Sequence, residues 1–88
     1  WDEAKRRANL SKHGLDFPLI DDFEWETATI EPDDRHDYGE PRWIATGLLN
    51  ARLCIVVFTY RVGRMRIISL RTAGNKEKAR YAKMAPWA

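Results

Sequence analysis

The chain has 88 residues, 44% of them hydrophobic, and a formal net charge of +2. This length suits one folded domain with a single core, and the apolar content is too high for a disordered chain. No apolar run approaches the roughly 20 residues that span a bilayer, and the single cysteine, Cys54, excludes an intrachain disulfide. We therefore expect one domain over residues 1–88, without a membrane segment, in the cytoplasm.

The charges are distributed unevenly along the chain. Acidic residues concentrate between positions 16 and 40, whereas positions 52–83 are rich in Arg and Lys and hold few acids. The mildly basic balance alone does not establish nucleic-acid binding. The uneven distribution, however, predicts one positively charged face on the folded domain.

The N-terminal segment has the features of a helix with both ends marked. Asp2 is a good N-cap, and Gly14 can adopt the left-handed conformation that closes a helix. We predict a first helix over Asp2–His13. Asp16 can then begin a second, shorter helix with Pro18 in its first turn. The apolar residues of this second helix would be Leu19, Ile20 and Phe23.

Four segments rich in β-branched and apolar residues follow, separated by polar or turn-forming residues. We predict strands over Thr27–Glu31, Arg42–Leu49, Arg52–Tyr60 and Met65–Arg71. The third segment is apolar on both faces at its centre, so we expect this strand to be covered on both sides. Short connections in strict sequence order favour a meander.

A closing helix is predicted over Lys76–Met84. Glu77 stands three residues after Gly74 and can accept a hydrogen bond from its backbone, as one half of a capping box. Two N-terminal helices, a four-stranded antiparallel meander sheet and one C-terminal helix together predict an α+β fold.

Three blocks of the sequence, taken together, resemble one protein family. They are WDEAKRRANLSKHGLDF at the start, DYGEPRW in the middle and RIISLRTAGNKEKARY near the end. In this order they are similar to the BrnT family of bacterial toxins, whose pattern begins W-D-x-x-K-x-x-x-N-x-x-K-H-G, continues through G-E-x-R, and ends R-x-I-S-x-R-x-A followed by E-x-x-x-Y. The matching positions are Trp1, Asp2, Lys5, Asn9, Lys12, His13, Gly14, Gly39, Glu40, Arg42, Arg66, Ile68, Ser69, Arg71, Ala73, Glu77 and Tyr81. The chain departs from the family at Gly74, where a Ser or Thr commonly caps the last helix.

The resemblance implies a fold similar to that of the RelE-type ribonuclease toxins, with helices on one face of an antiparallel sheet and RNA approached across the other. It implies a toxin of a type II toxin–antitoxin system that cleaves RNA and so arrests translation and growth. It also implies a partner, a BrnA-like ribbon-helix-helix antitoxin, which neutralises the toxin. The complex of the two would repress its own promoter, so the chain would meet DNA only through that complex.

The residues present favour chemistry without a metal ion or another cofactor. Two histidines far apart, His13 and His36, and one cysteine in an apolar run do not make a metal-binding signature. A ribonuclease would then depend on cations that stabilise charge on the phosphorane and on a few proton carriers. Two alternatives stay open: a non-catalytic toxin-like module that binds its antitoxin and acts in transcriptional autoregulation, and a plain RNA-binding module.

Four residues are candidates for catalysis. Arg71 would clamp a phosphate, since a guanidinium grips two oxygens in one plane; alternatively it is a solvated strand end. Glu40 would be a general base, or only the partner of Arg42 in an exposed ion pair. His13, at the negative end of a helix, should have a raised pKa and serve as a general acid, or simply cap the helix. Tyr81 would stack on a base or pack its ring in the core.

Four further residues are candidates for RNA contact, namely Lys12, Arg42, Arg66 and Lys76. Lys76 lies in the first turn of the last helix, where backbone N–H groups favour phosphate. Arg66 and Arg71 are an odd number of positions apart, so a regular strand would point them to opposite faces. In the loop before the second strand, Arg35 and Tyr38 could contact RNA bases.

Overall fold

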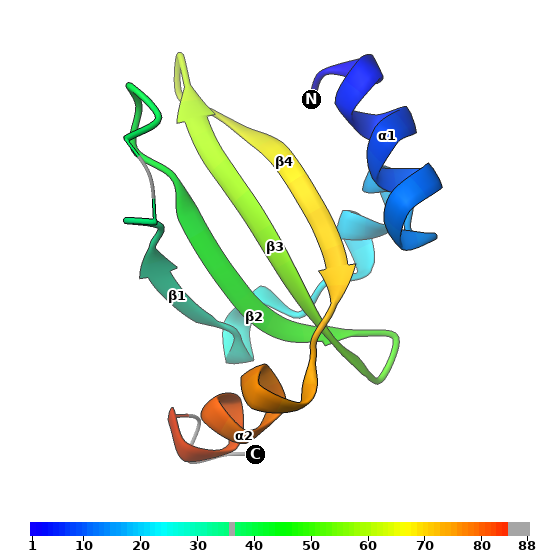
Figure 1. Cartoon of the computed structure of the whole chain (residues 1–88), viewed down its shortest axis with the longest axis vertical. Helices are drawn as coiled ribbons and strands as arrows, with labels where there is room; N and C mark the ends of the chain where they lie inside the picture. The colour runs from blue at the N-terminus through cyan, green and yellow to red at the C-terminus, as the bar shows by residue number, and fades with distance from the viewer. Residues whose placement is uncertain (36, 85–88) are drawn as a thin grey trace.

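The structure, a computed structural model, describes residues 1–35 and 37–84. In chain order it contains α1 (Glu3–His13), the 3-10 helices η1 (Phe17–Asp22) and η2 (Trp25–Thr27), the strands β1 (Thr29–Pro32), β2 (Trp43–Leu49), β3 (Arg52–Arg61) and β4 (Arg64–Thr72), and α2 (Asn75–Met84). The strands form one antiparallel sheet in the order β1-β2-β3-β4 (Figure 1). The predicted α+β meander is therefore confirmed. None of the helices described is both long and apolar enough to cross a membrane.

The second N-terminal helix differs from its prediction. Asp16 makes no side-chain capping bond, and the residues after it form a 3-10 helix rather than an α-helix. Pro18 lacks a backbone donor, and a segment this short gains little from α-helical hydrogen bonds. Thr27 belongs to the second 3-10 turn, so β1 begins two residues later than predicted and includes Pro32. Proline is tolerated there because β1 is an edge strand.

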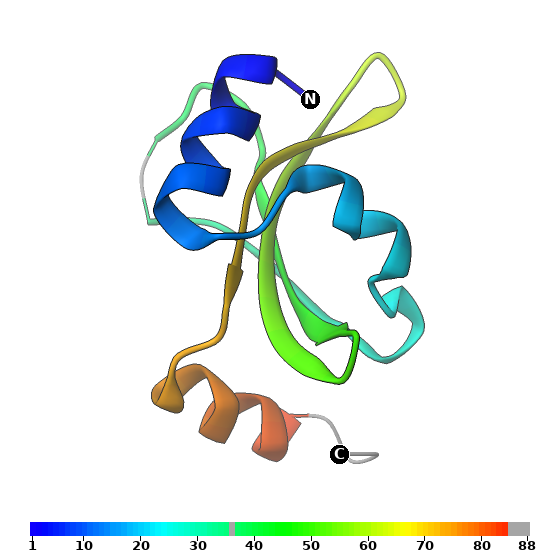
Figure 2. The ribbon, with the colours of Figure 1, turned by 90° about the vertical axis from the view of Figure 1, so that its right-hand side faces the viewer.

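The two faces of the sheet are covered by different elements (Figure 2). On one face, which we call the core face, η1 and η2 pack against the sheet. The buried cluster there comprises Phe17, Phe23, Ala45, Leu49, Cys54, Val56, Phe58, Ile67 and Leu70. The opposite, outer face carries the alternate residues of β2 and β3, and α2 lies against its lower end. Ile55, Val57 and Thr59 of β3 are also buried on this outer face, which confirms that the strand is covered on both sides.

A close approach at Gly47 fixes how tightly the 3-10 segment lies on β2. A Cβ atom at this position would stand 2.8 Å from Cζ of Phe23 and 2.9 Å from Cβ of Ala28. These separations are shorter than normal van der Waals contacts, so a larger residue would push the segment away from the sheet. The glycine thus allows η1 and η2 to seal the core face.

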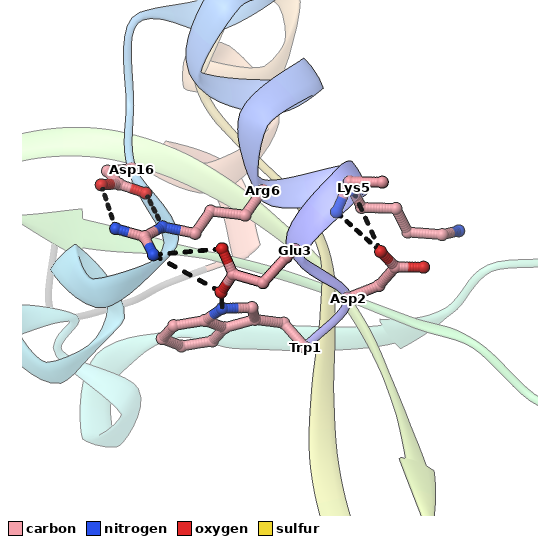
Figure 3. A network of polar contacts seen from close by, with 7 residues as sticks. Trp1, Asp2, Glu3, Lys5, Arg6 and Asp16 are labelled. Carbon is pink, nitrogen blue, oxygen red and sulfur yellow. Dashed lines mark hydrogen bonds and ion pairs between the residues drawn. The ribbon is translucent and has the colours of Figure 1, made fainter.

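Both ends of α1 have the predicted caps. The Asp2 carboxylate accepts hydrogen bonds from the backbone N–H groups of Ala4 (2.8 Å) and Lys5 (3.4 Å), and Gly14 has φ 72° (Figure 3). Arg6 then ties the helix to the start of η1, since its guanidinium contacts Asp16 at 2.7 Å and 3.0 Å. The position of α1 is therefore set at its ends and along its length.

Asn9, the one buried residue of α1, joins this helix to the outer edge of β4. Its side-chain amide donates to the carbonyl of Leu70 (2.8 Å), and its side-chain oxygen accepts from the Leu70 N–H (3.0 Å). A second hydrogen bond from the amide reaches the carbonyl of Leu15 (3.0 Å). The helix thus satisfies backbone groups that an edge strand would otherwise leave unpaired.

Candidate active site

A bulge in β4 places its two central arginines on the same face of the sheet. Val57 pairs with Ser69, but the next residue of β3, Phe58, pairs with Ile67, so Ile68 is an extra residue. Arg66 pairs with Thr59 and Arg71 pairs with Ile55, and both of these partners face outward from the core. The expectation of opposite faces was wrong because it assumed a regular strand.

Arg71 already grips a planar, two-oxygen anion. Its two terminal nitrogens lie 2.7 Å and 2.6 Å from the Glu77 carboxylate oxygens, and this pairing raises the pKa of Arg71. Glu77 also accepts a hydrogen bond from the backbone N–H of Gly74 (2.9 Å), as predicted for the capping box. A phosphate presents the same pair of oxygens to a guanidinium. The geometry at Arg71 therefore suits a phosphate that competes with Glu77.

His13 lies in a hollow between α1 and β4, near Arg71. The hollow has a volume of about 210 Å³ and is lined by Lys5, Ala8, Asn9, Lys12, His13, Ile68 and Ser69. Burial lowers the pKa of His13, and the positive charges of Lys12 and Arg71 lower it further. The predicted rise in the pKa of His13 was wrong, because burial and the positive charges of Lys12 and Arg71 lower it instead. Neutral at pH 7, His13 can accept a proton rather than donate one.

Two of the lining residues, Lys5 and Lys12, form a row of positive charge on α1 beside β4. Lys5 and Lys12 are seven residues apart, so they share one side of the helix at a separation of about 10 Å. Both side chains are exposed, and neither forms an ion pair within the described residues. Lys12 was predicted as an RNA contact, whereas Lys5 had been given no role. The seven-residue spacing between Lys5 and Lys12 is the sequence feature that predicts a role for Lys5 beside Lys12.

Glu40 lies at the opposite end of the outer face from Arg71. Its carboxylate accepts two hydrogen bonds from Arg61 (3.0 Å and 2.9 Å), and these lower the pKa of Glu40. Arg61 and Ile55, which pairs with Arg71, are six residues apart on β3, or about 20 Å at the usual rise of a strand. The structure therefore does not bring Glu40 together with Arg71 and His13.

Arg42 is held in place rather than free. Its guanidinium stacks over the Tyr38 ring at 4.0 Å and lies 3.8 Å from the Glu40 carboxylate. Only 22% of the Glu40 side chain and 19% of that of Arg42 is exposed, so this is not the exposed ion pair of the alternative interpretation. The Arg42 Nε is buried and has no hydrogen-bond partner within the described chain.

The remaining candidates differ in how accessible they are. The Tyr81 ring is buried, and its hydroxyl donates to the carbonyl of Thr27 (2.9 Å), which joins α2 to the segment before β1. Lys76 is exposed in the first turn of α2. Arg66 is partly buried, with its nearest nitrogen 3.9 Å from the Asp2 carboxylate. Packing thus accounts for Tyr81, while Lys76 and Arg66 can reach a ligand.

Arg35 adds a further cation near Arg71. It hydrogen-bonds the fully buried Asp33 carboxylate twice, at 2.8 Å each, and these bonds lower the pKa of Asp33 to about 2. The charge of Arg35 opposes the rise in the pKa of Arg71 and contributes to the lowered pKa of Glu77, so Arg35 acts on the same end of the outer face. The neighbouring His36 lies outside the described residues.

The outer face therefore combines cations from α1, β4 and the loop before β2 around one neutral histidine. A comparison with protein-family models matches residues 1–77 to the family described as "Ribonuclease toxin, BrnT, of type II toxin-antitoxin system". Comparisons with curated proteins and with solved structures found no match, so the likeness to RelE-type toxins stays a prediction. Since the match covers all but the last residues of the chain, the protein belongs to the BrnT family of ribonuclease toxins of type II toxin–antitoxin systems.

Proposed function

We propose that the chain cleaves RNA on its outer face without a metal ion, and that Arg71 and His13 act on the scissile phosphodiester. The observation that carries this proposal is that the two residues lie near each other. His13 lines one hollow with Ser69, which stands two positions before Arg71 on the same face of β4, and the charge of Arg71 contributes to the lowered pKa of His13. A neutral imidazole beside a guanidinium provides a proton acceptor next to a phosphate-binding group.

The reaction would be an internal transesterification. His13 takes the proton of the 2′-hydroxyl, the 2′-oxygen forms a bond to phosphorus, and the bond from phosphorus to the 5′-oxygen breaks. Arg71 stabilises the negative charge that develops on the phosphoryl oxygens. The leaving 5′-oxygen takes a proton from water, so the products are a 2′,3′-cyclic phosphate and a 5′-hydroxyl end.

Other cations of the outer face would position the RNA strand. Lys5 and Lys12 of α1, Arg66 of β4 and Lys76 of α2 supply exposed or partly exposed positive charge. Arg42, which stacks on Tyr38, would contact the RNA at the end of the outer face that is far from Arg71, where Glu40 also lies. Cationic side chains of this kind contact the phosphate backbone of the RNA, so they contribute little to recognition of the RNA sequence.

As a member of a type II system, the toxin has a cognate antitoxin. We propose that this antitoxin is a ribbon-helix-helix protein, that it neutralises the toxin by binding it, and that free toxin arrests translation and growth. In the complex, the antitoxin would contact the promoter DNA, and the toxin would be held at the promoter only through the antitoxin.

One observation favours a second candidate, a non-catalytic module that binds the antitoxin and acts in autoregulation. Arg71 is occupied by Glu77, and Glu40 is occupied by Arg61, so both would need to change partners before acting on RNA. Expression in a host separates the candidates. Growth arrest that co-expressed antitoxin relieves supports the ribonuclease, and harmless overexpression supports the module.

The direct test uses purified protein, a short RNA and an excess of chelator. We expect cleavage to persist and to leave a 2′,3′-cyclic phosphate, and we expect a 2′-deoxy substitution at the cleaved position to abolish it. Arg71→Ala should lose at least 100-fold of the rate, a loss typical of removing one charge-stabilising group. Arg52→Ala, an exposed arginine of β3 on the core-face side, is the matched control. Full activity of Arg71→Ala would contradict the proposal.

A further inference from the structure

We propose that the tip of the β3–β4 hairpin docks the cognate antitoxin, through a segment whose apolar side chains are flanked by carboxylates. This inference rests on the antitoxin partner included in the proposed function and adds the place where it binds. The tip borders an open hollow of about 560 Å³. The hollow is lined by Trp1, Arg61, Val62, Arg64, Met65 and Arg66.

Val62, at the very tip, is a residue that the fold alone does not favour. Its side chain is fully exposed, and its backbone has φ 52°, a left-handed conformation that suits Asn or Gly far better than a β-branched residue. The β2–β3 turn has the expected Asn50, with φ 49°, at the corresponding position. Val62 therefore adds strain and exposed apolar surface to the free protein, and a binding partner would account for both.

Further apolar side chains surround the tip. Trp1 is 44% exposed, and its ring is held by a hydrogen bond from Nε1 to Glu3 (3.0 Å; Figure 3) and by an edge contact with Phe17. Met65 is 37% exposed and pairs across the hairpin with Tyr60, which is 56% exposed. These residues supply an apolar surface in which the Trp1 ring is already held in place before binding.

The charges around the hollow select the chemistry of the partner. Arg61, Arg64 and Arg66 are its three charged residues. Arg64 has no ion-pair partner in the described part of the chain, and Arg66 lies 3.9 Å from its nearest carboxylate. Carboxylates of a bound segment would complete these pairs. A second copy of this chain would instead bring the same arginines together, which disfavours self-association at this surface.

A protein segment suits the hollow better than RNA does. Single-stranded nucleic acid binds through stacking on aromatic faces and through cations. Among the described residues that line the hollow, Trp1 is the one aromatic side chain, and its ring is already engaged in an edge contact with Phe17. The fully exposed side chain is that of Val62, which offers no flat face for stacking. Arg66 lies both in the hollow and on the outer face, so a bound antitoxin would also occupy one end of the proposed RNA path.

The test measures binding of the purified cognate antitoxin by calorimetry, in the absence of RNA. We expect Val62→Asn and Arg64→Glu each to weaken binding, with a dissociation constant at least tenfold higher than that of the parent. The unfolding midpoint of Val62→Asn should equal or exceed that of the parent, since Asn-Gly favours this turn. The matched control is Ile30→Thr, which replaces an exposed apolar residue on the other edge of the sheet and should bind like the parent.

Three results would overturn the proposal. The first is unchanged antitoxin binding by both hairpin variants. The second is weakened binding by Ile30→Thr alone, which would place the antitoxin on the edge of β1. The third is a loss of RNA cleavage by Val62→Asn with antitoxin binding retained, which would assign the hollow to RNA. Because binding is measured without RNA, a chain that cleaves nothing still tests this surface.

Discussion

Asn9 of α1 hydrogen-bonds both backbone groups of Leu70 in β4, as a neighbouring strand would. The contact fixes how far α1 stands from the sheet, and with it the hollow that contains Lys12 and His13. The same two hydrogen bonds cover part of an edge that could otherwise pair with another chain. A single buried amide thus serves both the fold and the candidate active site.

We expect Asn9→Ala to destabilise the protein by about 2–4 kcal/mol, because it leaves buried backbone groups of Leu70 without partners. Urea denaturation gives the free energy of unfolding directly. Ser11→Ala, an exposed position of the same helix, should change it by less than about 0.5 kcal/mol. Equal stability of the two variants would show that Asn9 is not a structural link.

The lowered pKa of His13 predicts the acid limb of the pH–rate profile. If neutral His13 is the base, cleavage should decline only below pH 6.5, the ordinary value for the side chain, as His13 becomes protonated. His13→Gln should lose about 100-fold or more of the rate at neutral pH and should also lose this limb. A parent profile that instead rises as the pH falls would identify His13 as an acid.

The same shift predicts the sign of a stability effect. His13 has a lower pKa in the folded protein than in the unfolded chain, so as the pH falls below 6.5 the unfolded chain takes up the proton first. His13 therefore supports the fold above pH 6.5, and this contribution is lost as the pH falls through the folded pKa. Thermal unfolding between pH 5 and 8 should show a smaller slope for His13→Gln than for the parent.

Glu77 should compete with RNA for Arg71. In Glu77→Gln the side-chain oxygen can still accept from Gly74, but the charge that neutralises Arg71 is gone. We expect tighter binding of a non-cleavable 2′-deoxy-substituted RNA, and a plot of log affinity against log salt that is steeper by about 0.7, the value for one more contact with a single strand. Fluorescence anisotropy at several salt concentrations measures both quantities. The control is Glu24→Gln, at an exposed position. Equal salt-dependence slopes for the two variants would show that Arg71 does not contact the RNA.

The elements of the fold were largely predictable because local signals and packing agree. Asp2 and Gly14 mark the ends of α1, and the apolar centre of β3 identifies the strand covered on both sides. The segment after Asp16 was not predictable in detail. Its apolar residues pack against the sheet from a 3-10 helix, and the close approach of Phe23 and Ala28 to Gly47 depends on the tertiary fold rather than on a local signal.

The arrangement of the candidate site depended on features with weak sequence signals. The bulge at Ile68 contains no glycine or proline from which it could be predicted, yet it determines whether Arg66 and Arg71 lie on the same face. The sign of the His13 pKa shift depends on burial and on the distant Arg71, neither of which helix position reveals. Glu77 was predicted as a cap, but its pairing with Arg71 joins residues whose approach only the folded chain defines.

The most direct measurement of the central claim is a double-mutant cycle in single-turnover RNA cleavage, in chelator, with Arg71→Ala, His13→Gln and the two combined. If both side chains act on one phosphodiester, the double variant should be about as slow as the slower single variant, because residues that act as a unit are strongly non-additive. Losses that simply multiply, or single variants that cleave like the parent, would contradict a shared site.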